Sequence, residues 1–430
     1  MRPVVVFIFH AAAANDAGPL VRALSDARCE LANRQRSAFL AAGADATVLV
    51  TGTPDELSFG ERFAAEIRGR IRSKDANAGG AIVLGSGSIP LARRPDLRRF
   101  VDVAAGPGGH ALANNRYSAD VVAVSRASIL AELPPLPADN ALPRWLDECA
   151  GVVVTDLSSN WKLSLDIDTP LDLLVLGLVP DRGSAARGRG AGSGRLGGTA
   201  GRSGATAAEL GVVAGDQTAA GARSAIPGME MSEDDSPPPS LREIAPLVGE
   251  HLAALQDVLM NRRAELLVAG RISATTLRWL ERGVACRVRA LVEERGLHAA
   301  SRLAQSGTTT DARPPRSILG ELLDRDGPES LARTVSNLAD AAVIDTRVLL
   351  AHRHGADESS VASPSATAQP SAEDRFASDL LLPATIADPW LRALTESATA
   401  PSGQPIVLGG HTLLNGGLRL LAERARAGRA

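Results

Sequence analysis

The stretch "WKLSLDIDTPLDLLVL", from Trp161 to Leu176, joins a strand-like apolar run to a second apolar run through a sharp turn. Asp166 and Asp168 stand on either side of one isoleucine, at the end of the first run. A strand followed at once by a helix is typical of an α/β sheet. The stretch therefore predicts an α/β domain with two carboxylates at the sheet edge where ligands bind.

The turn also carries the signals of a capped helix. Thr169 suits the N-cap, Pro170 is favoured at the first helical position, and Asp172 falls at the third position. Asp166 and Asp168 need not be acids for this cap. Two carboxylates on one side of a strand end repel each other unless a cation or an arginine lies between them.

Residues 1–180 alternate short apolar runs with amphipathic stretches, which predicts a largely parallel sheet covered by helices on both faces. The expected architecture is a Rossmann-like, three-layer α/β/α domain. The predicted strands are "VVVFIF" (4–9), "ATVLVTG" (46–52), "GAIVLGSG" (80–87), "ADVVAVS" (119–125) and "GVVVTDLS" (151–158). The predicted helices are "RQRSAFLAAGA" (34–44), "FGERFAAEIRGRIRSK" (59–74) and "PDLRRFVDVAA" (95–105).

The rest of the chain has a different composition. Residues 181–240 are rich in Gly, Ser, Ala, Arg and Pro, a composition that predicts a disordered linker. Residues 241–430 show apolar side chains at three- and four-residue spacing, which predicts a mainly α-helical domain with a disordered insert near 355–373. We expect one short strand in this domain, "QPIVLGGH" (404–411).

Bulk composition excludes several classes of protein. A net charge of −3 over 430 residues gives no field that would draw the protein to nucleic acid or membranes. The three cysteines lie far apart without a CxxC pair, which suits a reducing compartment. No run reaches the roughly 18 apolar residues of a membrane span, and "VVVFIF" is interpreted as a buried strand, not a signal peptide. We therefore expect a cytoplasmic protein without nucleic-acid or membrane partners.

The segment "DIDTPLDL" (166–173) resembles the D-[IV]-D-T-P-x-D-L segment of a nucleotidyltransferase family that includes molybdenum-cofactor and 2-phospholactate guanylyltransferases. The resemblance covers about the first 180 residues, including a strand that ends in "GSGSIPLA" (85–92). It implies a glycosyltransferase-A-like fold, a nucleoside triphosphate, a small-molecule acceptor and Mg²⁺. It also implies that Asp166 and Asp168 are the catalytic, metal-binding residues.

Two departures separate the chain from this family. The glycine-rich loop after the first strand is absent, and "FIFHAAAANDAGPLVRAL" (7–24) stands in its place; Arg22, Arg34 or Arg36 could supply the missing charge. Ser88 stands two residues before Pro90, where the family has a metal-binding aspartate. Since a hydroxyl is a weaker Mg²⁺ ligand than a carboxylate, the chain is either a diverged enzyme or a binding protein.

Two polar segments are candidates for ligand contacts. The first is a turn after a buried strand, whose backbone N–H groups suit a phosphate or sugar, although a plain turn explains it equally well. It contains Ser86, Gly87 and Ser88. The second precedes a strand beside the only tyrosine of the chain, and it either contacts a nucleotide or acceptor or forms an Asx turn. It contains Asn114, Asn115 and Arg116.

Three functional interpretations remain open from the sequence. In the first, the protein transfers NMP from an NTP to a phosphorylated or hydroxylated small-molecule acceptor with Mg²⁺. In the second, it is a non-catalytic nucleotide or sugar-nucleotide binding protein with a regulatory role. In the third, polar residues of the second half carry the chemistry; these are Asp345, Arg347, His352, His354, Asp374, Arg375, Asp379 and His411. In the first interpretation the second half supplies acceptor contacts or the dimer surface of a homo-oligomer, and in the second it is an output or partner surface.

Overall fold

The computed structural model describes residues 2–52, 65–69, 79–134, 136, 141–178, 241–293, 316–355, 369–400, 403–410 and 412–428. The predicted linker 181–240, most of the predicted insert near 355–373, and His411 lie outside these ranges. Of the predicted helix 59–74, residues 65–69 are described and are helical. We call residues 2–178 the first half and residues 241–428 the second half. Among the described helices, none has the length and apolarity to span a membrane.

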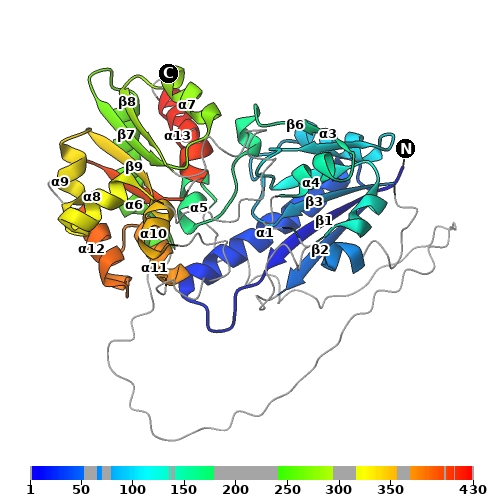
Figure 1. The fold of residues 1–430 in the computed structure, drawn as a ribbon, viewed down its shortest axis with the longest axis horizontal. Helices are drawn as coiled ribbons and strands as arrows, with labels where there is room; N and C mark the ends of the chain where they lie inside the picture. Colours follow the sequence, from blue (N-terminus) through cyan, green and yellow to red (C-terminus); the bar gives the residue numbers. More distant parts are fainter. Residues whose placement is uncertain are drawn as a thin grey trace, which may run out of the picture. The chain divides into compact units, whose positions relative to one another are not determined.

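The first half folds around a six-stranded sheet with the order β2-β1-β3-β5-β4-β6. Among these strands only β5 runs antiparallel to its neighbours, so the sheet is largely parallel, as predicted. Figure 1 shows β1 between β2 and β3. The strands are β1 (Val4–Ala11), β2 (Ala46–Gly52), β3 (Gly80–Gly85), β4 (His110–Ala113), β5 (Val121–Val124) and β6 (Val153–Asp156). The short strand β4 is the one that the sequence did not predict.

Alternation along β1 sends its side chains into two separate cores. Val4, Val6 and Ile8 pack with side chains of α1 and α3 on one face of the sheet. Phe7 packs with side chains of η1 and α4 on the other face. These helices are α1 (Pro19–Ala41), α3 (Arg94–Ala105), η1 (Ala127–Glu132) and α4 (Leu142–Glu148). The first half therefore has the three layers that the sequence predicts.

The run "WKLSL" is not a strand, which corrects one prediction. It forms a short 3₁₀ helix, η3 (Trp161–Leu163), and Asp166 then makes an isolated antiparallel bridge with Ser88. The predicted capped helix is confirmed as α5 (Pro170–Leu176). The Asp172 carboxylate accepts hydrogen bonds from the backbone N–H of Thr169 at 2.7 Å and from its hydroxyl at 3.1 Å.

The prediction of a mainly α-helical second half is not confirmed. This half contains a four-stranded parallel sheet with the order β10-β9-β7-β8. The strands are β7 (Glu265–Gly270), β8 (Arg287–Val292), β9 (Ala341–Asp345) and β10 (Ile406–Gly409). Only β10, within "QPIVLGGH", was predicted, and that prediction is confirmed.

Two of the missed strands, β7 and β9, share a physical cause. β7 ("ELLVAG") and β9 ("AAVID") are rich in Leu and Ala, which favour helices, and every residue from Leu266 to Gly270 and from Ala341 to Asp345 is buried. A fully buried strand shows no alternation of polar and apolar residues, so its pattern cannot be distinguished from that of a buried helix.

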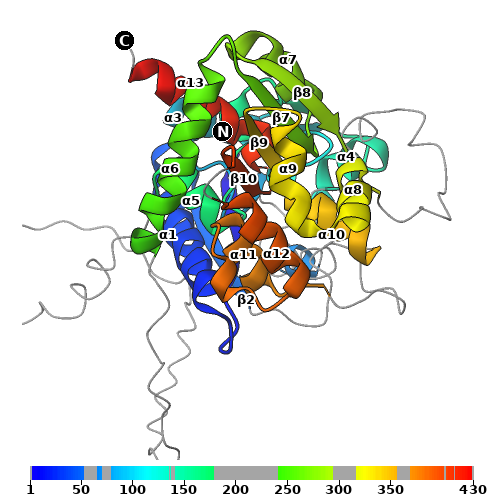
Figure 2. The same ribbon diagram turned by 90° about the vertical axis from the view of Figure 1, so that its left-hand side faces the viewer.

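Helices cover both faces of the second sheet. Figure 2 shows α6 on one side of the sheet and α9 on the other. α13 contacts α6 and α7, whereas α10 contacts α8, and α12 contacts α9 and α11. These helices are α6 (Leu241–Leu259), α7 (Ala274–Gly283), α8 (Ile318–Asp326), α9 (Leu331–Ser336), α10 (Thr346–His354), α11 (Ala372–Asp379), α12 (Pro389–Ala398) and α13 (Leu418–Ala427). The second half is therefore a second α/β/α sandwich.

The two halves share one hydrophobic core. Leu20, Leu24 and Leu31 of α1 belong to the same buried cluster as Leu171 of α5 and the strands of the second sheet. Residues 1–179 and 239–430 accordingly form one compact unit. This packing brings polar groups from both sheets into contact.

Candidate functional site

The order of strands in the first sheet defines one expected binding edge. The chain leaves β1 for β2 on one side and later returns to β3 on the other side, so a topological switch point lies between β1 and β3. Ligands of open α/β sheets bind beyond the carboxyl ends of strands at such a point. His10 of β1 and Ser86 after β3 meet there, with 3.1 Å between the Nδ1 atom and the hydroxyl oxygen.

The second sheet has a switch point of its own. β7 is followed by β8 on one side, and β9 is followed by β10 on the other, so the order reverses between β7 and β9. Asp345 ends β9, and Arg271 follows β7. The Arg271 guanidinium donates to both Asp345 carboxylate oxygens, at 2.8 and 3.2 Å. This ion pair therefore lies at the second switch point, where it joins the carboxyl ends of β7 and β9.

The segment that contains Asp166 and Asp168 lies against the turn Ser86–Ser88. The backbone N–H of Ile167 donates to the Gly87 carbonyl at 2.9 Å. A Cβ atom on Gly87 would lie 2.8 Å from the Ile167 carbonyl oxygen, so this close approach requires glycine. Asp166 and Asp168 are therefore held at the carboxyl edge of the first sheet, as the sequence predicts.

The same segment also contacts the carboxyl edge of the second sheet. The Thr412 hydroxyl, beyond β10, donates a hydrogen bond to Asp166. Arg347, in the first turn of α10 after β9, lies 3.7 Å from an Asp168 carboxylate oxygen. The binding edges of two sheets thus meet at one short stretch of chain. We call Arg28, Asp166, Asp168, Arg347 and Thr412 the junction cluster.

Arginines balance the charge of Asp168. The Arg28 guanidinium lies 3.3 Å from one carboxylate oxygen of Asp168, and Arg347 approaches the other. Arg28 also donates to the Ile167 carbonyl. The Asp168 side chain keeps 24% of its surface exposed, so the arginines do not enclose it. Both arginines pair with Asp168, whereas Asp166 accepts its hydrogen bond from the Thr412 hydroxyl.

Asp166 is in a less favourable environment. Burial raises the pKa of the Asp166 carboxyl group well above its ordinary value, and the neighbouring charges of Asp168 and Asp120 raise it further, against the hydrogen bond from Thr412. Asp120 directly precedes β5, which is antiparallel to β3, so it lies beside the carboxyl end of β3. A cluster of carboxylates with perturbed pKa values at a binding edge marks a candidate functional site.

Two further buried aspartates lie close to the junction cluster. Burial raises the pKa of Asp172 to about 7, and the charge of Asp168 contributes. Burial also raises the pKa of Asp379 to about 7, while Arg347 acts in the opposite direction. Both carboxyl groups therefore titrate close to neutral pH.

The predicted contact residues near the tyrosine are occupied by structural interactions. The buried Asn114 side chain donates to Asp120 and to the Leu163 carbonyl, both at 2.8 Å, and accepts from the backbone of Asp120 and Val121. Asn115 accepts from the backbone N–H two residues later, which is the Asx turn that the sequence left open. Arg116 pairs with Asp147. Of these residues, Asn114 is linked to the site, because it holds Asp120 beside the carboxyl end of β3.

The predicted turn is placed at the site but is also braced. The Ser86 side chain is bonded to His10 as described above. The Ser88 hydroxyl donates to the Asp120 carbonyl at 3.0 Å, and its own carbonyl accepts from Gln35. Among the described residues, no group of three or more His, Cys, Asp or Glu side chains is arranged to hold a metal ion. A Mg²⁺ ion held by Asp166 and Asp168 would therefore need phosphate and water oxygens as its other ligands.

Sequence reasoning missed several residues of this site. Arg22, Arg34 and Arg36 were predicted to supply the missing positive charge, and Arg28 was not. Arg28 nevertheless lies on the face of α1 that meets the sheet edge. His10 lies in the segment that replaces the glycine-rich loop and was not predicted as a site residue; burial, with Arg28 nearby, lowers the pKa of its imidazole. Thr412 carried no signal, because its partner is 246 residues away in the chain. The third interpretation did single out Asp345, Arg347 and Asp379, and the fold brings these near the site.

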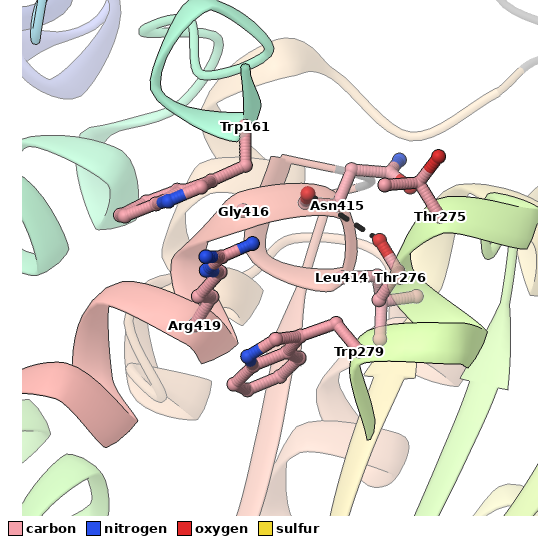
Figure 3. A pocket seen from close by; sticks show the side chains of 8 residues that line it. All are labelled: Trp161, Thr275, Thr276, Trp279, Leu414, Asn415, Gly416 and Arg419. Atoms are coloured by element: carbon pink, nitrogen blue, oxygen red, sulfur yellow. Dashed lines mark hydrogen bonds between the residues drawn. The ribbon is translucent and has the colours of Figure 1, made fainter. Parts of the chain in front are cut away.

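A recess lies beside the junction cluster (Figure 3). Its lining combines indole rings, one guanidinium group and short polar side chains. The recess is shallow, because only about 10 Å³ of it is open to the centre of a water-sized sphere. We call it the aromatic recess; it is lined by Trp161, Thr275, Thr276, Trp279, Leu414, Asn415, Gly416 and Arg419.

Comparisons with known proteins give little guidance to the function. No protein-family model matches the chain, and no curated protein is similar to it. One solved structure that resembles it is that of a proposed nucleotide-diphospho-sugar transferase from Desulfovibrio desulfuricans. The two chains share 12% sequence identity with a TM-score of 0.27, over 44% of this chain and 91% of the other. A similarity of this size supports no conclusion about activity.

Proposed function

We propose that the protein is a diverged nucleotidyltransferase that moves an NMP group from a nucleoside triphosphate to a small-molecule acceptor. The observation that carries the proposal is the position of Asp166 and Asp168. They lie beside the turn Ser86–Ser88 at the carboxyl edge of the first sheet, and the charge of Asp120 is close enough to raise the pKa of Asp166. Carboxylates crowded at a binding edge are suited to a divalent cation with bound phosphates.

Asp120 supplies a carboxylate that the sequence lacks at Ser88. Because β5 runs antiparallel to β3, the start of β5 brings Asp120 next to Ser88, whose hydroxyl bonds to the Asp120 carbonyl. The departure from the family motif at Ser88 thus leaves an acid in the same neighbourhood. Asp166 and Asp168 would hold Mg²⁺, and the bound ion would offset negative charge on the phosphates.

The proposed transfer replaces one phosphorus–oxygen bond by another, with atoms and charge conserved. An acceptor oxygen forms a bond to the α-phosphorus of the triphosphate, and the bond from that phosphorus to the bridging oxygen breaks. Pyrophosphate leaves with the bonding electrons, and a hydroxyl acceptor releases its proton to solvent. Arg28 and Arg347 flank Asp168, where their guanidinium groups can bind phosphate oxygens in a bidentate manner.

Thermal melting of the full chain with each NTP, with and without Mg²⁺, tests the proposal. We expect a Mg²⁺-dependent rise of the melting temperature that is lost in Asp168→Asn. The matched control is Asp102→Asn, because Asp102 is an exposed acid that pairs with Arg98 on the surface of α3. The proposal is wrong if no NTP stabilises the wild-type chain in the presence of Mg²⁺, or if Asp168→Asn responds as the control does.

One observation favours a second candidate, a non-catalytic nucleotide-binding protein. Arg28 and Arg347 already balance the charge of Asp168, so phosphates could bind to the arginines without a metal ion. In that case NTPs would raise the melting temperature equally with and without Mg²⁺. Arg347→Gln would then abolish the rise, whereas Asp168→Asn would leave it in place or increase it.

A further inference from the structure

The first turn of α1 leaves two backbone N–H groups without a partner inside the helix. Gly18, at the N-cap, has no side chain that could accept a hydrogen bond, and the turn contains no acidic residue. Pro19 has no N–H group, and the N–H of Arg22 already donates to the Gly18 carbonyl at 3.0 Å. The N–H groups of Leu20 and Val21 therefore remain, at a helix end whose dipole attracts negative charge.

A carboxylate from the second half of the chain occupies this position. Glu373, in the first turn of α11, accepts from Leu20 at 2.9 Å with one oxygen and from Val21 at 3.2 Å with the other. Figures 1 and 2 show α11 beside α1. A Cβ atom on Gly18 would overlap the carboxylate, so the glycine keeps the approach open. The end of α1 therefore already binds two oxygens of one anionic group, which a distant part of the chain supplies.

This end of α1 lies where open α/β sheets bind phosphate groups. α1 follows β1, so its N-terminus is at the carboxyl edge of the first sheet, beside the switch point between β1 and β3. Phosphates bind at such helix ends through backbone N–H groups, as the carboxylate oxygens do here. Arg28 of the junction cluster is seven residues beyond Val21, which places it on the same face of α1, about 10 Å along the helix. The Glu373 carboxylate therefore occupies a phosphate position on the helix that also carries Arg28.

We propose that Glu373 is an autoinhibitory latch, whose carboxylate fills a phosphate position at the N-terminus of α1 and is displaced when a phosphate group binds there. Glu373 is only half-buried, so its side chain can turn out to solvent without opening the shared core. Because the latch is tethered to the chain, it competes at a high effective concentration, and free phosphate binds weakly while it is in place. The exchange of carboxylate for phosphate stands without the proposed function; only the assignment of that phosphate to the NTP rests on it.

Thermal melting of the full chain in inorganic phosphate, without Mg²⁺ or nucleotide, tests the inference. Chloride keeps the ionic strength constant, and the rise of the melting temperature with phosphate concentration gives an apparent Kd for each variant. Glu373→Ala removes the latch and should bind phosphate about 10- to 150-fold more tightly than the wild type, the equivalent of one hydrogen bond to a charged group. Glu373→Gln keeps one acceptor oxygen but loses the charge, so it should show a smaller gain; this variant carries the test if Glu373→Ala does not fold.

Asp388→Ala is the matched control. Asp388 caps α12 by accepting from the backbone N–H of Leu391 at 2.7 Å, so its loss also leaves a helix end without its cap. The Asp374 carboxylate, which accepts from the backbone N–H of residue 388 at 3.3 Å, stays at that end and repels an anion. Phosphate should therefore stabilise Asp388→Ala no more than the wild type. The inference is overturned if neither Glu373 variant gains affinity for phosphate, or if Asp388→Ala gains as much.

A second series, with ATP and GTP in the absence of Mg²⁺, identifies the source of the phosphate group. If the NTP of the proposed function supplies it, Glu373→Ala should also bind one of these nucleotides more tightly than the wild type does. A gain confined to inorganic phosphate would overturn the assignment to the NTP and leave a latch that controls a free anion. Because the first series contains neither nucleotide nor metal, its outcome is independent of the Mg²⁺ test above.

Discussion

Replacing Asp379 by asparagine should remove part of the pH dependence of stability. Asp379 is buried, and its carboxylate accepts a hydrogen bond from the Thr346 hydroxyl at 3.2 Å. An asparagine Oδ1 atom can accept the same bond, so the substitution removes the ionisable group and little else. Burial raises the pKa of Asp379 from the ordinary 3.8 to about 7, so the folded protein holds a proton that the unfolded chain has already released.

The sign of the effect follows from this proton. Below about pH 4 the carboxyl group is protonated in both states and contributes nothing. Between about pH 4 and 7 unfolding releases the proton, so the free energy of unfolding falls as the pH rises, by about 1.4 kcal/mol per pH unit. Above about pH 7 the loss levels off at about 4 kcal/mol. This figure is an upper bound, because the folded state can relax around the charge.

Urea unfolding followed by far-UV circular dichroism, repeated from pH 5 to pH 8, measures the difference. Asp379→Asn should gain stability over the wild type as the pH rises, by up to about 3 kcal/mol between pH 5 and pH 7. Asp102→Asn, which removes an exposed carboxylate, should follow the wild-type curve. Parallel curves for Asp379→Asn and the wild type would refute the reasoning, because the carboxyl group would then titrate alike in both states.

Two further substitutions test contacts that join the parts of the fold. The Glu373 carboxylate of α11 accepts hydrogen bonds from the backbone N–H groups of Leu20 and Val21, at 2.9 and 3.2 Å, and so caps α1. In urea titrations Glu373→Ala should lower the free energy of unfolding by about 1–2 kcal/mol, and an unchanged value would contradict this role. Gly87→Ala should cost about 1–3 kcal/mol and weaken NTP binding, because its Cβ atom would clash with the segment that contains Asp168. Gly52→Ala adds a carbon with no atom of the described residues within 4 Å, so in thermal melting it should change stability by less than about 0.5 kcal/mol. Equal losses in both variants would exclude a specific clash.

The sequence predictions are accurate where a structural feature depends on residues that are close together in the chain. The capped helix after Asp168 was predicted because its partners, Thr169 and Asp172, lie within one helical turn. The strands of the first sheet other than β4 were predicted because β-branched residues mark them, as in "VVVFIF" and "GAIVLG". Both features depend on neighbouring residues alone.

The second sheet and most of the site depend on distant residues. "AAVID" forms strand β9 because it pairs with β7 and β10. The apolar residues in and around this segment of sequence indicate only that it is buried. Arg28 and Asp168 are 140 residues apart in the chain, and Thr412 and Asp166 are 246 apart. No local pattern encodes such pairs, since they arise only when distant segments of the chain pack together.

The core that the two halves share restricts how a ligand can reach the junction cluster. Hinged enzymes open a cleft by swinging lobes apart, but here Leu20, Leu24 and Leu31 of α1 would be pulled out of apolar surroundings. Each exposed leucine costs about 1.5–3 kcal/mol, so a wide opening would be rare on this account alone. A ligand would instead reach Asp168 through the 24% of its side-chain surface that stays exposed. Arg28 and Arg347, the partly exposed partners of Asp168, flank that route.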